Sequence, residues 1–425
     1  MTELGHSERR ALADALQSGT LSQSDAQSEL EMKGAYGVEK LPQSVAFFTG
    51  YVPPYALPVM TEIAARVERM SVFVSTPMEG NRSWDVEHGG LDVVVQRTMT
   101  FLTRWKHRAG FSDRSETHVP WDTLFQLTRM RPDVVVSEEL GFRSFFCSIY
   151  TTLTRTPLVL VCNLSEHTEQ GRGMLRGLLR KWLSWAAVAT TANGTSGLRY
   201  LNEAGFRSDS LALFSYAAKP GVFETLELAR RPEQIHRLIC VSELSERKGI
   251  GPFLRCLAVW CQKNPDQQVK MDIVGEGPIR DELEAIEMPV SASVSFVGQK
   301  SYRELASLMQ ASGVLVFPTL ADEWGLVVNE ALAAGLPVLG SKYSQAVSDL
   351  VEDGYNGWSF DPLDESDTFD SLNHMLTSSD QTIESMRQVC RDSVAERSPT
   401  WAAEQLVTVI KSVTTDHGNQ KEKTH

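Results

Sequence analysis

The sequence alternates short, almost wholly apolar segments with longer amphipathic ones, and this alternation restricts the fold more than any other feature. The apolar segments form two sets along the chain. The first set is SVAFFTG, SVFVST, LDVVVQ, PDVVVSE, TPLVLVCN and AAVATTA, and the second is RLICVSEL, VKMDIVGEG, VSFVGQ, GVLVFPT and PVLGSK. Strands that are apolar along their whole length are typical of parallel sheets covered by helices on both faces. The pattern therefore predicts an α/β protein with two Rossmann-like, doubly wound domains.

The polar stretches around the two sets give the expected domain limits. The stretch between the sets is polar and contains two prolines, which is typical of a linker. Both ends of the chain are polar, and such composition favours mobile or disordered segments. The predicted order is a mobile extension over 1–44, a first domain over 45–215, a linker over 216–236, a second domain over 237–398, a helix over 399–413 that can pack on either domain, and a disordered tail over 414–425.

Composition excludes several classes of protein. The formal net charge of −13 argues against general affinity for nucleic acid. The six cysteines show no CxxC spacing and several lie inside apolar segments, so we expect reduced thiols in a cytoplasmic protein. The N-terminal residues lack the apolar core of a signal peptide, and no run of 18 apolar residues predicts a membrane span.

Ligands of open α/β sheets bind beyond the carboxyl ends of the strands, so two such sheets facing each other predict an interdomain cleft. The stretch ADEWGLVVNEALAAG follows a predicted strand and opens a helix there. Backbone amides at Gly325, Leu326 and Val327 would form a helix N-terminus that suits a diphosphate. Glu330 lies one turn further on, where its carboxylate can accept two hydroxyl donors, and Asp322 can hold sugar hydroxyls. The alternative is that these acids only favour the helix N-terminus through its dipole.

Other strand ends add further candidates. Lys248 opens a helix after RLICVSEL and can neutralise a phosphate, although a lysine on a loop is often only solvated. Gly298 and Gln299 end a strand where backbone groups can contact a base. Gly50 ends the first strand and allows close approach of a ligand. His167 follows a buried strand of the first domain and can orient a substrate hydroxyl, or it is a surface histidine.

A basic segment in the first domain is amphipathic. Its cations recur at Arg172, Arg176, Arg180 and Lys181, with Leu and Trp between them. Such a helix can contact anionic lipid as a peripheral membrane segment. The alternative is an ordinary helix of the core with one solvated face.

The order of these motifs is more specific than any one of them. ICVSELSERKGI, DIVGEGPIRDEL, FVGQKSYRELASLM, GVLVFPTLADEWGLVVNEALAAGLPVLGSK and LVEDGYNGWSFDP follow one another, and together they resemble the nucleotide-sugar domain of retaining GT-B glycosyltransferases of family four. The resemblance is strong over residues 237–362 and weak over the first domain. It implies a GT-B fold, a nucleoside diphosphate sugar as donor, no metal or other cofactor, and retention of anomeric configuration.

The resemblance also implies roles for individual residues. The family has two Glu separated by seven residues, and Asp322 and Glu330 have this spacing. By resemblance Glu330 holds the ribose, the first carboxylate meets the donor sugar, and Lys248 stabilises the diphosphate. His167 would orient the sugar or the acceptor from the facing domain.

Two positions depart from the family pattern. Asp322 is shorter than the usual Glu, and Glu323 can serve in its place if the loop shifts. Glu243 stands where the family usually has an Arg, so Arg247 becomes the candidate for the second cation.

The sequence thus predicts transfer of a hexosyl group to an acceptor hydroxyl of a glycan or a lipid-linked molecule, in the cytoplasm or at the inner face of the membrane. Nucleic acid is not an expected partner. Two alternatives remain open. One is a non-catalytic partner subunit that binds nucleotide sugar, and the other is a GT-B sugar epimerase.

Overall fold

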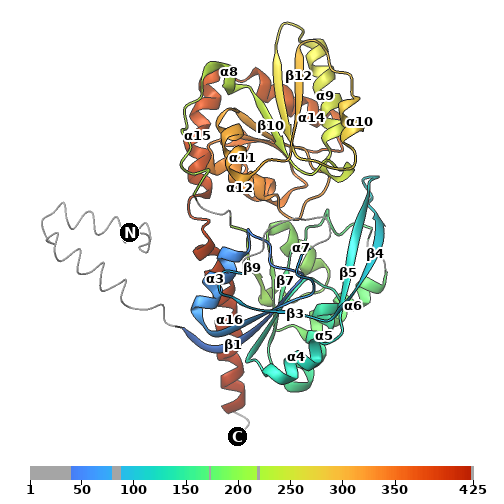
Figure 1. Ribbon diagram of the computed structural model, residues 1–425, viewed down its shortest axis with the longest axis vertical. Coiled ribbons are helices and arrows are strands. Elements are labelled where there is room, and N and C mark those ends of the chain that lie inside the picture. The colour runs from blue at the N-terminus through green and yellow to red at the C-terminus, as the bar shows by residue number, and fades with distance from the viewer. Residues whose placement is uncertain (1–39, 79–87, 172–173, 218–220, 423–425) are drawn as a thin grey trace, which may run out of the picture.

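The computed structural model describes residues 40–78, 88–171, 174–217 and 221–422. The chain forms two α/β domains stacked along the long axis of the molecule (Figure 1). The two predicted doubly wound domains are therefore confirmed. Most of the predicted extension, residues 1–39, lies outside the described residues.

The first domain contains a seven-stranded parallel sheet in the order β3-β2-β1-β6-β7-β8-β9. Its strands are β1 (Leu41–Thr49), β2 (Val67–Val74), β3 (Asp92–Val95), β6 (Val134–Glu138), β7 (Leu158–Cys162), β8 (Ala189–Ala192) and β9 (Leu211–Leu213). Its helices are α3 (Leu57–Arg66), α4 (Thr123–Met130), α5 (Phe142–Thr154), α6 (Met174–Ala186) and α7 (Thr195–Glu203), and a short 3-10 helix, η1 (Ser208–Ser210), precedes β9. Buried apolar clusters cover both faces of the sheet, as the apolar strands require.

An antiparallel hairpin, β4 (Thr98–Lys106) and β5 (Ser112–Pro120), extends from the first domain toward the second (Figure 1). The sequence did not predict this hairpin. Most side chains of β4 are exposed, and its sequence TMTFLTRWK alternates polar and apolar residues only in part, unlike the continuous apolar strands of the two sheets.

The second domain contains a six-stranded parallel sheet in the order β12-β11-β10-β13-β14-β15. Its strands are β10 (Leu238–Val241), β11 (Val269–Val274), β12 (Ala292–Gly298), β13 (Val314–Phe317), β14 (Val338–Ser341) and β15 (Gly357–Phe360). Its helices are α8 (Pro232–Ile235), η2 (Glu246–Lys248, 3-10), α9 (Ile250–Lys263), α10 (Arg280–Glu284), α11 (Tyr302–Gln310), α12 (Leu326–Ala333), α13 (Gln345–Leu350), α14 (Glu365–Thr377) and α15 (Asp380–Val394).

The last helix, α16 (Pro399–Glu422), returns to the first domain and packs against α3. Buried residues of α16 join the apolar cluster on that face of the sheet, namely Ala402, Ala403, Leu406, Val409 and Ile410. The sequence left the side on which this helix packs open, and the structure assigns it to the first domain.

Three predicted limits need correction. Strand β1 begins at Leu41, inside the predicted extension over 1–44, because its backbone pairs with β2 and because Asp133 accepts hydrogen bonds from Ser44. Helix α8 lies inside the predicted linker over 216–236, where Ile235 is buried. Helix α16 continues to Glu422 through the predicted disordered tail over 414–425, because this polar segment contains no proline to stop it.

Buried polar side chains join the two domains. The side-chain amide of Gln345 at the start of α13 donates to the carbonyl oxygens of Leu164 (2.8 Å) and Glu323 (2.6 Å). Asn193, after β8, donates to the same Glu323 carbonyl at 2.6 Å. Gln345 and Asn193 are each only 1% exposed, so these hydrogen bonds form a buried and specific junction between the two domains. Among the described residues, no helix is long and apolar enough to cross a bilayer.

Candidate active site

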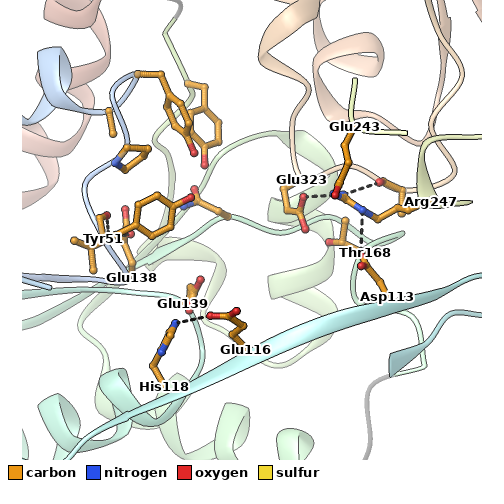
Figure 2. Close-up of a pocket in the computed structure, with 18 of the residues that line it drawn as sticks. Tyr51, Asp113, Glu116, His118, Glu138, Glu139, Thr168, Glu243, Arg247 and Glu323 are labelled. Atoms are coloured by element: carbon orange, nitrogen blue, oxygen red, sulfur yellow. Dashed lines mark hydrogen bonds and ion pairs between the residues drawn. The ribbon is translucent and has the colours of Figure 1, made fainter. Parts of the chain in front are cut away.

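A cleft of about 1080 Å³ lies between the domains, at the carboxyl ends of strands from both sheets. The first domain lines it with the turn after β1, the β4–β5 hairpin and the end of β6 (Figure 2). The second domain lines it with the loop after β10 and the loop after β13. This is where two facing α/β sheets place their ligands. Of the residues predicted from sequence, Gly50, Arg247 and Glu323 line this cleft.

Arg247, in η2, is the cation of the second domain that borders the cleft. Its Nε lies 3.1 Å from Asp113 Oδ2 of the hairpin, and one terminal nitrogen lies 3.5 Å from Glu323 Oε2 (Figure 2). That terminal nitrogen also donates to the Ala321 carbonyl at 3.2 Å. Burial works against the charge, yet the carboxylates of Glu323, Asp322 and Asp113 hold the pKa of Arg247 above its usual value. The guanidinium is therefore charged and already neutralised by carboxylates from both domains.

Lys248 and Asp322 form a buried ion pair beside the cleft. Asp322 Oδ1 accepts a second hydrogen bond, 3.2 Å long, from the backbone amide of Trp324. Burial works against ionisation of Asp322, but the charges of Lys248 and Arg247 hold its pKa below the usual value. Neither Lys248 nor Asp322 lines the cleft in this structure. The predicted phosphate-binding lysine is thus paired with the predicted sugar-binding aspartate.

The two adjacent acids, Asp322 and Glu323, point to different places. A backbone bridge between Asp322 and Ser344 turns Asp322 inward, and its side chain is only 10% exposed. The side chain of Glu323 is 43% exposed and faces the cleft. The geometry therefore favours Glu323 for contact with a molecule in the cleft, as the departure from the family pattern allowed.

Helix α12 begins at the glycine-bearing turn that the sequence predicted. Gly325 has φ = 101°, and a Cβ there would lie 2.6 Å from Phe317 Cε1, so both conformation and space require glycine. Leu326 and Val327 form the first helical turn and are half-buried. Their amides are at the positive end of the helix, as predicted for a diphosphate site, although these residues do not line the cleft.

Glu330 points from α12 toward the start of α11, where Tyr302 donates a 3.0 Å hydrogen bond to its Oε1. Burial raises the pKa of Glu330 to about 7, although the bond from Tyr302 opposes the rise. Gly298, with φ = 72°, and Gln299 precede α11. The structure thus brings the predicted ribose-binding acid close to the segment that was predicted to contact the base. None of these residues lines the cleft.

His167 lies at a second contact between the domains and outside the cleft lining. Its ring stacks on Tyr343 of the second domain, with 3.8 Å between ring centroids. Its backbone carbonyl accepts a 2.6 Å hydrogen bond from His107 of the hairpin. Burial lowers the pKa of His167, so the ring is neutral near pH 7. In this structure His167 packs two segments together, and its neighbour Thr168 lines the cleft instead.

Sequence reasoning missed the carboxylates at the end of β6. Glu138 is half-buried and accepts a hydrogen bond from Thr49, and loss of solvent around its carboxyl group raises its pKa to about 7. Glu139 has the left-handed φ of 67°, which is uncommon for a residue other than glycine and costs about 1–3 kcal/mol. Both line the cleft. The segment VVVSEE places Glu138 at the end of a buried strand and Glu139 directly after it, so the strand-end rule would have identified both.

Arg143 of α5 holds this corner of the cleft in place. It is 3% exposed, donates from Nε to Ser75 Oγ (3.1 Å), and lies 3.5 Å from a carboxylate oxygen of Glu139. A Cβ on Gly50 would lie 3.5 Å from its guanidinium, which is an ordinary van der Waals contact, so packing in this structure does not require glycine at this position.

The hairpin adds Glu116 and His118 to the same corner. His118 Nε2 lies 3.9 Å from a carboxylate oxygen of Glu116. Burial and then the charge of Arg143 lower the pKa of His118, against the opposing effect of Glu139 and Glu116. No signal in the sequence identified this pair, because the hairpin itself was not predicted. Within the described ranges, no three His, Cys, Asp or Glu side chains gather in a way that would hold a metal ion.

The basic segment of the first domain forms α6, but Arg172 lies outside the described residues. Arg180 pairs with Glu169 and turns toward the protein, whereas Lys181 is exposed. Leu178, Trp182 and Trp185 are 68%, 39% and 66% exposed, respectively. The exposed face of α6 therefore combines aromatic, aliphatic and cationic side chains. An ordinary core helix would expose mainly polar side chains on that face.

Comparison with known proteins agrees with this geometry. Residues 228–393 match the model of the family described as glycosyl transferases group 1. A D-inositol 3-phosphate glycosyltransferase of Corynebacterium urealyticum is 30% identical over 46% of this chain and 48% of its own length. The sulfoquinovosyl transferase SQD2 of Arabidopsis thaliana is 29% identical over 31% of this chain and 25% of its own length. The chain thus aligns with about half the length, or less, of these curated relatives.

Solved structures extend the likeness to both domains. Anabaena Alr3699/HepE, crystallised with UDP and glucose, superposes with a TM-score of 0.63 at 17% identity, over 87% of this chain and all of the other. Sucrose-phosphate synthase from Thermosynechococcus elongatus superposes with a TM-score of 0.61 at 16% identity, over 88% of this chain and all of the other. Over residues 228–393 the second domain therefore matches a group 1 glycosyl transferase domain, and the chain as a whole has the GT-B fold.

Proposed function

We propose that this protein transfers a hexosyl group from a nucleoside diphosphate sugar to an acceptor hydroxyl, with retention of configuration and without a metal. The observation that carries the proposal is the cleft between two parallel sheets, bordered on one side by the group 1 domain. The printed titles of the neighbouring structures describe complexes with UDP and glucose and with UDP-glucose, which supports a donor of this class.

Charge on the departing diphosphate grows in the transition state of such a transfer. Lys248, Arg247 and the amides at the start of α12 would stabilise it, and the cations would do so without a metal ion. Both cations are paired with carboxylates in this structure, so the diphosphate must displace those partners. Arg247 pairs with Asp113 of the other domain, and hence a change in the separation of the domains would free it.

Two residues would hold the rest of the donor. Glu330 would accept hydrogen bonds from the ribose hydroxyls in place of the one it accepts from Tyr302. Glu323, which faces the cleft, would contact the hexosyl group. Glu243 is exposed on the same wall and adds negative charge near the diphosphate, which makes donor binding weaker than with an arginine there.

Isothermal titration with UDP-glucose, GDP-mannose and their free nucleotides tests the donor part of the proposal. We expect one nucleotide class to bind, and Glu330→Ala and Lys248→Ala each to weaken binding at least tenfold. Glu404→Ala, on the exposed side of α16, is the control and should bind like the parent protein. Absence of binding by every nucleotide sugar would contradict the proposal.

Turnover separates the competing functions. A transferase releases free nucleoside diphosphate, and the release stops in Glu330→Ala and is unaffected by chelators. NMR of the product should show the same anomer as the donor. Donor binding without release over a panel of acceptors would instead indicate a non-catalytic partner subunit. Formation of an epimerised sugar without an acceptor would indicate an epimerase.

We also propose that the protein works at the cytoplasmic face of a membrane, in assembly of a polysaccharide or lipid-linked glycan. The exposed face of α6 supports this, since Trp and Leu side chains beside a lysine suit the interface of an anionic bilayer. The corynebacterial relatives are named for D-inositol 3-phosphate, so this polyol phosphate is to be compared as an acceptor with its unphosphorylated form.

A further inference from the structure

The charges around the cleft are strongly unbalanced. Three arginines line it, and seven carboxyl-bearing side chains do so, namely Asp113, Glu116, Glu138, Glu139, Glu243, Glu246 and Glu323. Two of the arginines are already committed, since Arg247 pairs with Asp113 and Glu323, and Arg143 pairs with Glu139. The third, Arg104, is exposed on β4. Away from Arg104, an anion on the acceptor side would therefore meet carboxylates that outnumber the arginines and whose paired arginines are already in ion pairs.

The carboxylates of the first domain share one corner of the cleft. Glu139 acts electrostatically on both Glu138 and His118, and Glu116 lies 3.9 Å from His118. Figure 2 shows Glu116, Glu138 and Glu139 around the same space. The strained backbone at Glu139 is what presents its carboxylate, 66% exposed, at this corner. Strain of this kind is retained mainly where the side chain has a task.

Aromatic rings form another part of the same wall. Tyr51, Tyr55, Tyr216 and Trp105 line the cleft, and Tyr55 and Tyr216 meet edge to face with 5.8 Å between ring centroids. Tyr216 is half-buried, and loss of solvent around its hydroxyl raises its pKa, so the phenol is neutral. Aromatic faces cover the apolar C–H faces of a sugar ring, while carboxylates accept hydrogen bonds from its hydroxyls. The two kinds of side chain together are the composition expected of a saccharide site.

We propose that the first-domain wall of the cleft binds the accepting unit as a saccharide or polyol that presents hydroxyl or ammonium donors and carries no phosphate or carboxylate. Glu116, Glu138 and Glu139 accept hydrogen bonds from these donors, and the tyrosines cover the ring. A lipid anchor with its phosphate remains compatible if that phosphate lies outside the cleft. The assignment rests on the proposed function, because it treats this wall as the acceptor side.

Direct binding to the full-length protein, with and without UDP-glucose, tests the proposal. The first measurement is binding to a glycan array of neutral, amine-bearing, phosphorylated and carboxylated saccharides. The second is calorimetry with two matched sets of compounds. One set is glucose, glucosamine and glucose 6-phosphate, and the other is myo-inositol and myo-inositol 3-phosphate. We expect the protein to retain array members that carry no anionic group. In calorimetry, we expect the anion-free compound of each set to bind at least tenfold more tightly than its phosphate, a difference of about 1.4 kcal/mol in binding free energy. The glucosamine arm shows whether an ammonium or a hydroxyl is preferred. The proposal would be overturned if the phosphates bound equally or more tightly, or if the array retained only saccharides that carry an anionic group or none at all.

Charge variants show whether the carboxylates cause the preference. Glu116→Lys/Glu139→Lys should reverse it, and Glu116→Gln/Glu139→Gln should reduce it while nearly preserving side-chain shape. Glu404→Lys makes one of the same charge changes away from the cleft and should leave the preference intact. Preference that persists in both double variants would place the acceptor elsewhere.

Nucleoside diphosphate release separates this inference from the proposed function. Binding of anion-free saccharides without release would refute transferase activity and leave the ligand class standing. Release stimulated only by phosphorylated acceptors would support the transferase and refute the ligand class.

Discussion

At the scale of single residues, Glu138 and Glu330 are half-buried glutamates of the described part of the chain whose pKa is raised to about 7. The cause is burial in each case, and one lies in each domain. Because the ordinary value is 4.5, the folded state binds more protons than the unfolded state between pH 4.5 and 7. Their contribution to stability is therefore complete below pH 4.5 and is lost as pH rises toward 7.

Glu138→Gln should flatten that dependence, since the amide does not ionise. We expect the urea midpoint of the variant to fall less between pH 5 and pH 8 than that of the parent protein. Glu404→Gln, at an exposed position, should keep the parent dependence. An unchanged fall in Glu138→Gln would show that Glu138 ionises normally.

Residue positions show where prediction from sequence stops. Glu330, Lys248 and Gly325 could be named as candidates because they follow a strand end and a helix start, which are local properties of the sequence. The choice between Asp322 and Glu323 could not be made, because it depends on the bridge to Ser344, a contact distant in sequence. His167 was expected in the cleft, yet it stacks on Tyr343 of the other domain, and such packing leaves no local pattern.

At the scale of elements, the β4–β5 hairpin is the feature that connects the two walls of the cleft. Phe111 at its tip is buried against Leu320 and Ala321 of the second domain. The backbone amide of Ser112 donates to Glu246 at 3.3 Å, next to the ion pair between Asp113 and Arg247. The apolar strands of both sheets were predicted from their continuous apolar runs, whereas β4 mixes polar residues with exposed apolar ones and was not recognised as a strand.

Asp113→Asn should strengthen donor binding. Removing this carboxylate leaves Arg247 with less competition for a diphosphate, and at a partly exposed site we expect roughly threefold tighter binding of UDP. Calorimetry at low and high salt measures it, and the gain should shrink in high salt. Asp266→Asn, in the exposed turn before β11, is the matched control. Weaker binding in Asp113→Asn would show that Asp113 supports the donor site instead.

Helix α6 carries the membrane proposal. Trp182→Ala/Trp185→Ala should reduce co-sedimentation with vesicles rich in phosphatidylglycerol at least tenfold, because both rings lie on the exposed face. Val290→Ala, a fully exposed apolar residue of the second domain, should have no effect. Equal vesicle binding by the double variant would place the contact on another surface.

At the scale of the whole molecule, the C-terminal helix completes the core of the N-terminal domain. Leu406 of α16 is fully buried in the cluster that covers one face of the first sheet. The sequence predicted the helix from its apolar spacing but left its partner open, since either domain has an apolar face to cover.

Leu406→Ala should therefore destabilise the first domain by about 2–5 kcal/mol, as a cavity in a well-packed core does. When urea unfolding of the variant is monitored by limited proteolysis, the first cleavages should fall within residues 45–215, although the substituted residue lies far from them in sequence. Leu363→Ala, at a 54% exposed position, should unfold like the parent protein. Early cleavage in the second domain would contradict this arrangement.

The return of α16 also means that the chain joins the two domains twice. Ala217 is buried in the first core and Phe223 in the second, and the chain passes back between Val394 and Ala402. Two rigid domains that the chain connects at two points rotate relative to each other mainly about the axis through those points. In Figure 1 the hairpin lies on the side of the molecule away from the α15–α16 crossing, so its tip lies far from the rotation axis. A small turn would produce the largest displacement there, and separation of Asp113 from Arg247 would come early in the opening of the cleft.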